Sequence, residues 1–593
     1  MLTTFACLAL AGSTLSGAND PSRVAVPISP ATAGIGRVVA PLTGVSLRGD
    51  SVRIPQPGAK FTVVALTGVS CPLTMRYGPT LAALEDQYAK RGVQFVFVNP
   101  AGSETTQEMK AQVARLGLNG SYLNSPNMAA NLGAKTTTEA FLLNSNGKLL
   151  YRGAVDDQYS IGANLPKPRN QYLVSALESA LAGAPVKVAA TWAPGCLLAD
   201  APPVKEAAPT YHEDIERLVQ KNCIECHRTG GPAPFALDTY EAVKSRAPML
   251  KYVVEKGIMP PWFATKPGAT SEWKNDRSLA DAEKAKLNAW IDGGFLKGDP
   301  KKAPKPFEAV PGWTIGKPDV VLQMPDPIQI PATGTMSYQY VKIPTGFTED
   351  KWIQKVEVLP GDTKLVHHIL VFIIPPAGRT KIGGPLDTGF GGLSTYFGIY
   401  VPGNSTQVFT EGLAKRIPAG STLQFQIHYT PNGTASTDQS KIGLIFAKAP
   451  PKNEVFTSSV AKVTFMIPPG APNHLVTHRV KVPLDIEVLS YLPHMHVRGK
   501  AAKYELIDAK GAKSTLLDIP RYDFNWQLAY LYRKPIKVAA GSELHYSAWY
   551  DNSDKNPANP DPKKTVFFGD QTFDEMFLGY FDYIVPGLKF ESK

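Results

Sequence analysis

The segments AGSTLQFQIHY, residues 419–429, and AGSELHYSAWY, residues 540–550, form an internal repeat in the C-terminal half of the chain. Both lie in a region of short period-2 patterns that continues to the C-terminus, which is typical of strands buried on one face. The repeat predicts two similar all-β sandwich domains of jelly-roll type. We place them at residues 318–450 and 451–593.

Upstream of the repeat, residues 35–186 alternate strand-like and helix-like stretches. FTVVALTG, VQFVFVNP and FLLNSNGKLLYRG are the strand-like pieces, and Asn146-Gly147 in the last of them indicates a hairpin. The pattern predicts a small α/β domain. It resembles a thioredoxin-like, redoxin domain, with Cys71 in SCPLTMRYGP just after the first core strand, where that fold carries its reactive thiol.

Two helical patterns follow an Ala- and Pro-rich linker at residues 187–208. TYHEDIERLVQKNCIECH is the first, and SLADAEKAKLNAWIDGG is the second, with a capping pattern at Ser278 and Asp281. We therefore expect a small all-α unit at residues 209–297, followed by a linker at 298–317.

Length and composition restrict the class of protein. A chain of 593 residues is long enough for about four domains. Its net charge of +11 comes without long Lys/Arg runs, so nucleic acid is not expected as a partner. The apolar start, residues 1–19, is interpreted as a signal peptide, although no Lys or Arg precedes it. We expect a periplasmic or secreted protein with no further transmembrane segment.

The motif Cys223-Ile-Glu-Cys226-His227 is the attachment pattern of a c-type haem, in which two thiols add to the vinyl groups and the histidine ligates iron. The segment resembles mono-haem cytochrome c domains. In these a downstream Met-Pro-Pro-Trp supplies the sixth ligand, which implies Met259, with Met249 as the alternative. A redox Cys-x-x-Cys or half a zinc site is the competing interpretation.

The histidines of the C-terminal half form metal-ligand patterns. His494 and His496 share one face of a strand and can bind one ion. His367 and His368 are adjacent, so both can bind one metal only where the strand is bulged or ends. His428, in QIHYT, is the fifth candidate.

Residues 318–593 resemble the copper type-II, ascorbate-dependent monooxygenases, the family of the peptidylglycine α-hydroxylating and dopamine β-monooxygenases. The resemblance implies two copper ions. The electron-transfer copper would take His367, His368 and His428, and the oxygen-activating copper would take His494, His496 and Met576 in FDEMFLGY. Gln426 and Tyr580 also match the family and are counted as site residues. Two imidazoles with a thioether favour Cu(I), while zinc on the same histidines would perform no redox work.

The segment departs from that family at positions that bear on the substrate. Leu492 stands where the peptidylglycine enzyme has a carboxylate-binding arginine, and Leu578 replaces an asparagine. A C-terminal glycine carboxylate is therefore not the expected substrate. The copper region also contains no cysteine, so its sandwiches depend on packing alone.

Cys71 and Cys196 are two further candidate catalytic residues. A thiol at a helix N-terminus has a lowered pKa and oxidises readily. The peroxiredoxin pattern Pro-x-x-x-Thr-x-x-Cys and the Cys-x-x-Cys pattern are both absent, and Thr138 replaces the cis-proline usual in this fold. Cys196 is the candidate disulfide partner of Cys71; otherwise Cys71 is an exported thiol of unknown use.

Taken together, these patterns and the family resemblance imply an exported copper-dependent monooxygenase that hydroxylates a C–H bond of a small-molecule substrate with O2. Two copper ions and one covalently bound haem c are the expected cofactors. The haem would supply electrons from ascorbate or a redox protein. The alternatives are a non-catalytic copper and haem electron-transfer protein, or a thiol peroxidase-type redoxin with accessory domains.

Overall fold

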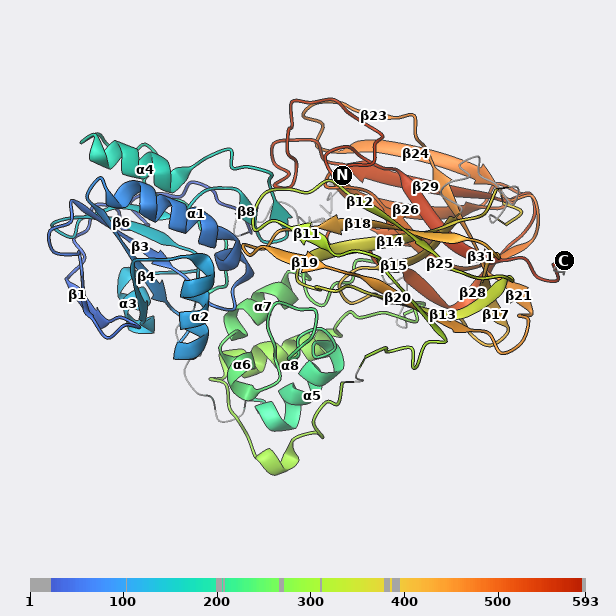
Figure 1. Ribbon diagram of the computed structural model, residues 1–593, viewed down its shortest axis with the longest axis horizontal. Coiled ribbons are helices and arrows are strands. Elements are labelled where there is room, and N and C mark those ends of the chain that lie inside the picture. Colours follow the sequence, from blue (N-terminus) through green and yellow to red (C-terminus); the bar gives the residue numbers. More distant parts are fainter. Residues whose placement is uncertain are drawn as a thin grey trace, which may run out of the picture.

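The computed structural model describes residues 23–102, 104–198, 205, 208–265, 271–309, 312–377, 384–386 and 395–588. The expected signal peptide lies outside these residues. Over the described ranges, no helix has both the length and the apolar character that a membrane span requires. An α/β unit, a helical unit and a β region follow one another along the chain (Figure 1).

The α/β unit is built on a five-stranded sheet with the strand order β5-β4-β3-β6-β7. Its strands are β3 (Phe61–Leu66), β4 (Val93–Asn99), β5 (Ser121–Asn124), β6 (Ala140–Asn144) and β7 (Leu149–Gly153). Its helices are α1 (Pro72–Ala89), α2 (Thr106–Leu116), α3 (Pro126–Leu132) and α4 (Tyr172–Leu181). Val63 and Ala65 of β3 pack with α1 and α4, whereas Val64 and Leu66 pack with α3. Both faces are covered, so β3 is almost wholly buried.

Two short antiparallel pairs complete this unit: β1 (Leu42–Val45) with β2 (Ser51–Ile54), and β8 (Tyr159–Ser160) with β9 (Ala163–Asn164). The hairpin predicted at Asn146-Gly147 is confirmed as the β6–β7 connection. Gly147 has φ +78°, and a Cβ there would lie 2.8 Å from the carbonyl oxygen of Val39, so only glycine fits.

The helical unit surrounds the buried side chain of Trp290. Its elements are the π-helical turn η2 (Tyr211–Ile215), α5 (Glu216–Asn222), α6 (Tyr240–Lys244), α7 (Ala247–Glu255), α8 (Asp281–Asp292) and the short η3 (Pro300–Lys302). The predicted capping pattern of the last long helix is wrong by two residues. Ala280 is the N-cap, and its N–H donates to the Glu283 carboxylate, while Ser278 bonds Asp276 instead.

The β region contains two pairs of sheets. The first pair, here called the N-terminal sandwich, has the orders β10-β20-β13-β17-β21, with β16 beside β13, and β12-β18-β14-β15. Its strands are β10 (Val320–Gln323), β12 (Gln339–Pro344), β13 (Lys351–Leu359), β14 (Val366–Ile374), β15 (Tyr396–Tyr400), β16 (Thr406–Val408), β17 (Leu413–Ile417), β18 (Thr422–Tyr429), β20 (Lys441–Phe446) and β21 (Asn453–Glu454). The short β11 (Ile328–Ile330) and β19 (Ser436–Asp438) pair separately.

The second pair, the C-terminal sandwich, has the orders β22-β31-β25-β28 and β24-β29-β26-β27. Its strands are β22 (Phe456–Ala461), β24 (His474–Lys481), β25 (Ile486–His494), β26 (Gly499–Ile507), β27 (Lys513–Ile519), β28 (Tyr530–Val538), β29 (Glu543–Tyr550) and β31 (Leu578–Ile584). The short β23 (Met466–Ile467) and β30 (Val566–Phe567) form a separate pair.

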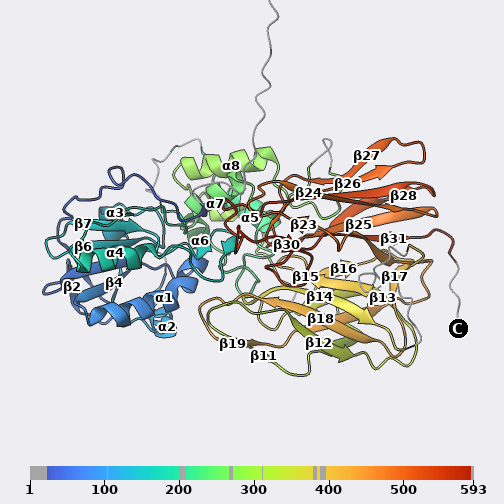
Figure 2. The same cartoon turned by 90° about the horizontal axis from the view of Figure 1, so that it is seen from above.

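The two sandwiches repeat one strand order. The sequence β12-β18-β14-β15 corresponds to β24-β29-β26-β27, and β10-β20-β13-β17 corresponds to β22-β31-β25-β28. The two repeat segments found in the sequence lie in β18 and β29, which occupy matching places. In Figure 2 the sandwiches lie one above the other, with the α/β unit at one end and the helical unit beside them.

Candidate functional site

The side chains of Cys71 and Cys196, the candidate disulfide pair, interact with each other as free thiols. Cys71 is the N-cap of α1 and is 2 % exposed. Cys196 is held against Thr137, the residue before Thr138, by two hydrogen bonds: its N–H donates to Thr137 Oγ1 and its carbonyl accepts from Thr137 N–H. Both cysteines are free thiols. The loop at the usual cis-proline position therefore holds the second cysteine beside the first.

The electrostatics of this pair favour a thiolate on Cys71. The hydrogen bond from the Cys196 thiol lowers the pKa of Cys71 most; burial opposes this, and bonds from Thr137 and Thr74 lower the pKa further. The pKa of Cys196 is raised well above its ordinary value by the same contact and by burial. Cys71 is therefore the thiol of the pair that ionises more readily, which is the property of an attacking thiol.

A measurement of alkylation against pH tests this polarity. Because the thiolate is the reacting form, the reaction of Cys71 with iodoacetamide is expected to have its midpoint below the ordinary thiol pKa of about 8.5. Cys196→Ala removes the strongest donor and should move the midpoint upward, whereas Cys196→Ser keeps a donor and should move it less. Peptide-resolved mass spectrometry separates Cys71 from the other cysteines. If Cys196→Ala leaves the midpoint unchanged, Cys196 does not lower the pKa of Cys71.

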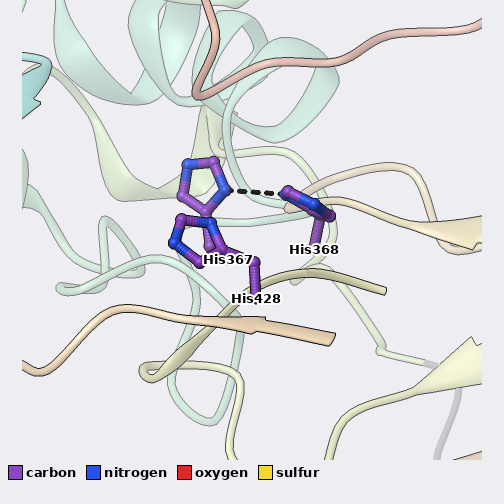
Figure 3. Close-up of side chains that lie close together, drawn as sticks. All are labelled: His367, His368 and His428. Atoms are coloured by element: carbon purple, nitrogen blue, oxygen red, sulfur yellow. Dashed lines mark hydrogen bonds between the residues drawn. The ribbon is translucent and has the colours of Figure 1, made fainter. Parts of the chain in front are cut away.

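A bulge at the start of β14 brings both adjacent histidines to one site. The register between β14 and β18 shifts between Val366 and His368. Such a bulge is what allows His367 and His368 to bind the same metal ion. His368 then lies directly across the ladder from His428. The ligating atoms of the three histidines lie within 4.8 Å of one another, and the rings face each other (Figure 3). The Nδ1 atoms of His367 and His368 are 3.0 Å apart.

The second pair of histidines lies beside this group. His494 ends β25, and His496 follows in the connection to β26. The His494 ring is 6.4 Å from the His368 ring, centre to centre. Nδ1 of His494 donates to Gln527 Oε1 at 2.7 Å, and Nδ1 of His496 faces the carbonyl of Asp574 at 3.3 Å. In both histidines the contact at Nδ1 leaves the lone pair of Nε2 free to bind a metal ion.

Two aromatic rings lie among the five histidines. Phe524 stacks on His367 at 5.0 Å and lies about 6 Å from His368, His428 and His496. Tyr338 lies between the two sets, 5.0 Å from the ring of His428 and 6.2 Å from that of His496. The two ligand sets, from separate sandwiches, therefore form one cluster with an aromatic interior.

The predicted sixth ligand, Met576, is tied to the His496 segment through its neighbour Glu575. The buried Glu575 carboxylate accepts backbone N–H groups from His496 at 2.8 Å, Arg498 at 2.6 Å and Met576 at 3.3 Å. The Tyr550 hydroxyl holds the same segment, because it donates to the Met576 carbonyl. Met576 itself is buried among apolar side chains that include Leu492, one of the family departures.

The ring nitrogens of this cluster have the properties that a metal site requires. Burial lowers the pKa of His367 and His494 to about 4 and that of His496 to about 3, so the imidazoles are neutral. His368 Nε2, His428 Nδ1 and His496 Nε2 are buried without a hydrogen-bond partner. Unpaired buried nitrogens are costly unless another group binds them. The residues present therefore fit a metal ion that binds imidazole, such as copper.

The two other family-matched residues contact the protein rather than the histidine rings. Gln426 donates to the Tyr340 hydroxyl at 2.9 Å. Tyr580 is buried and stacks on Tyr396 at 5.2 Å, inside the apolar cluster that also contains Met576 and Leu578. Their roles here are packing and hydrogen bonding between strands, and a direct role in chemistry remains a prediction.

The Cys-x-x-Cys-His motif follows α5 at the edge of the helical unit. Nδ1 of His227 donates to the Phe235 carbonyl at 3.1 Å, which leaves Nε2 free as an axial ligand for iron. Cys223 and Cys226 are partly exposed free thiols. Both Met259 and Met249 pack against the core of the same unit. This arrangement fits a covalently attached haem, with the choice of Met259 still a prediction.

Sequence patterns did not point to Gln527, Asn525 or Phe524, which lie in the loop before β28. Gln527 contacts both ligand sets, since its Nε2 lies 3.5 Å from His368 Nδ1 while its Oε1 binds His494. Asn525 accepts from His367 Nε2 at 3.3 Å. The only available signal was the run of turn-forming and aromatic residues RYDFNWQ between two strands. Glu575 directly precedes Met576 in FDEMFLGY, but no ligand pattern in the sequence marks it.

Comparison with known proteins identifies one part of the chain. The Redoxin family model matches residues 29–164. An uncharacterised conserved protein from Geobacillus kaustophilus is 24% identical, over 31% of this chain and 98% of that one, with a TM-score of 0.27. The thioredoxin domain of a thiol-disulfide oxidoreductase from Bacteroides vulgatus is 15% identical, over 20% and 86%, with a TM-score of 0.19. No curated protein matches the chain.

Residues 29–164 thus form a thioredoxin-like domain of the redoxin type, as the position of Cys71 had predicted. Domains of this type are built for oxidoreductase chemistry at a thiol. The rest of the described chain is mostly β-sheet, with the helices of residues 211–292 between the two parts.

Proposed function

We propose that this protein is an exported, copper-dependent monooxygenase, located in the periplasm or secreted, with a redoxin domain and a c-type haem segment in the same chain. The observation that carries the proposal is the convergence of five histidines from two sandwiches on one buried cluster with unpaired ring nitrogens. The expected cofactors are two copper ions and one haem c. The expected partners are O2, a small organic substrate and an electron donor.

The residues around the cluster hold the candidate ligand side chains in position. Copper bound there would supply one-electron redox chemistry and a place for dioxygen. Gln527 and the Asp574 carbonyl orient the rings of His494 and His496, and Glu575 holds the His496 and Met576 segments together. Phe524 and Tyr338 pack against the histidine rings and support them from the side. The overall reaction would convert R–H, O2, two electrons and two protons into R–OH and water.

Contacts through strand β15 connect the haem motif to the histidine cluster. A Cβ on Gly403 would lie 3.3 Å from the Cys226 sulfur, so the motif packs against the turn that follows β15. Tyr400 of β15 pairs directly with Ile369, the residue after His368. One strand therefore separates the haem-attachment cysteine from the three-histidine group, which favours transfer between the two.

Reoxidation of the haem tests the proposal. The full chain, produced in an export-competent host with haem attached, is reduced and then mixed with air, with and without loaded copper. Copper is expected to speed haem reoxidation by about ten-fold or more, together with oxygen uptake. Equal rates with and without copper, or zinc in place of copper by elemental analysis, would refute a copper monooxygenase.

A second candidate function rests on the contact between Cys71 and Cys196. In it the Cys71 thiolate attacks a partner disulfide and forms a mixed disulfide. Cys196 then displaces the partner thiol, so the partner is reduced to a dithiol while Cys71–Cys196 is oxidised to a disulfide. Cys71→Ser separates the two functions: copper-dependent oxygen uptake should persist, and disulfide exchange should disappear.

A further inference from the structure

A cavity of about 560 Å³ reaches the histidine cluster, and its wall comes from the redoxin domain and from both sandwiches. His367, His428 and Phe524 line it, and both histidines are partly exposed. The redoxin domain contributes the β8–β9 hairpin and the residues around it, within Gln158 to Pro166. About 170 residues or more separate this part of the redoxin domain from the lining residues of the sandwiches, so only the tertiary structure joins them.

The hairpin is attached to the histidine cluster through Asn525. Its Nδ2 donates to the Gly162 carbonyl at 2.7 Å, at the tip of the hairpin, while its Oδ1 accepts from His367 Nε2 at 3.3 Å. The acceptor role of Oδ1 keeps the proton on Nε2 and leaves His367 Nδ1 as the ligand atom. Asp523 orients the amide by accepting from its Nδ2 at 2.8 Å.

The redox helix α1 supports the same hairpin from the other side. Arg76 of α1 donates to the side chain of Asn164, and Tyr77 packs edge-on against Tyr159 at 5.0 Å. A Cβ on Gly433 would lie 2.1 Å from the Met75 carbonyl, so α1 also packs directly on the loop that follows His428. The hairpin is therefore held in place between α1 and the loop of the C-terminal sandwich that carries Asn525.

We propose that the redoxin hairpin completes the substrate cavity of the copper site, and that Asn525 positions His367 against it. The cavity has more apolar than polar wall, with Tyr159, Leu165, Tyr429 and Phe573 among its lining. Its volume lies within the range of about 300–1,000 Å³ that holds small organic ligands. The substrate is then a small organic molecule with an apolar or aromatic body. This inference rests on the proposed function for the chemistry, but its geometry does not depend on copper.

Chemical modification of the metal-free full chain tests the geometry. Ala163 lines the cavity from the hairpin, and Ala163→Trp should fill it. Diethyl pyrocarbonate is expected to modify His367 and His428 about ten-fold more slowly in this variant, while His474 on β24 keeps its rate. Ala184→Trp, at an exposed position of the same domain, is the matched control and should change none of the three. Peptide mass spectrometry reads each histidine separately.

Two further measurements complete the test. Asn525→Ala releases the hairpin and should raise the modification rate of His367, an effect opposite in sign to that of Ala163→Trp. Indole at millimolar concentration should protect His367 in the natural chain and not in Ala163→Trp. Unchanged rates at His367 in both variants, or no protection by indole, would overturn the proposal. Copper content, measured separately, shows whether the proposed function itself has failed.

Discussion

Replacement of His368 by alanine is expected to abolish copper binding by the three-histidine group. His368 is fully buried, faces His367 across 3.0 Å and pairs with His428 across the ladder. Two imidazoles would remain where three converge, so the affinity of that group should fall by more than about a hundred-fold. The copper content of the full chain should drop from about two ions to about one, and haem reoxidation should return to the copper-free rate.

The matched control is His545→Ala, because His545 lies on β29 beside Glu505 and belongs to neither ligand set. It should leave the copper content unchanged. The spectrum of the remaining copper gives a second readout, since the His494 and His496 set is still complete in His368→Ala. Full retention of two copper ions in His368→Ala would remove His368 from the ligand set.

Glu575→Ala is expected to destabilise the C-terminal sandwich by about 3–5 kcal/mol. The carboxylate is wholly buried and accepts three backbone N–H groups, all of which would be left without a partner. Arg498, which is 1 % exposed, would also lose its nearby negative charge. The free energy of opening at the amides of β25 and β31, measured by hydrogen exchange, should fall by this amount.

Glu575→Gln serves as the control for shape, since an amide keeps one acceptor oxygen and fills the same space. It should cost less than Glu575→Ala. The strands of the redoxin domain, β3 and β4, should keep their protection in both variants. An opening free energy within about 0.5 kcal/mol of the natural chain for Glu575→Ala would contradict the role assigned to the carboxylate.

The adjacent histidines can form one site only because the strand that carries them is bulged. An adjacent pair, His367 and His368, cannot share a face of a regular strand, so the sequence allowed one site only with a bulge. The register shift after Val366 supplies that bulge. The sequence pattern therefore required a bulge, and the hydrogen bonding between β14 and β18 provides it.

Elsewhere the local sequence pattern gave a wrong prediction, or did not determine where a residue lies. Ser278 matched the composition of a helix cap, but the helix begins at Asp281 because Glu283 reaches back to the Ala280 N–H. In the redoxin domain Cys-x-x-Cys is absent, and the sequence offered Cys196 only as a candidate partner of Cys71. The bonds of Cys196 to Thr137 place it beside Cys71 from a distant part of the chain. Partners that are far apart in sequence leave no periodic signal.

The sequence by itself determined which reactive groups the chain contains: five histidines with a methionine, a Cys-x-x-Cys-His motif and a thiol after a buried strand. It also determined the alternating patterns from which the duplicated sheets form. The tertiary structure alone decided that both ligand sets meet around Phe524, that Gln527 contacts both, and that a redoxin hairpin forms a wall of their cavity. Periodicity specifies which face of an element is buried, whereas packing between distant elements specifies what that face meets.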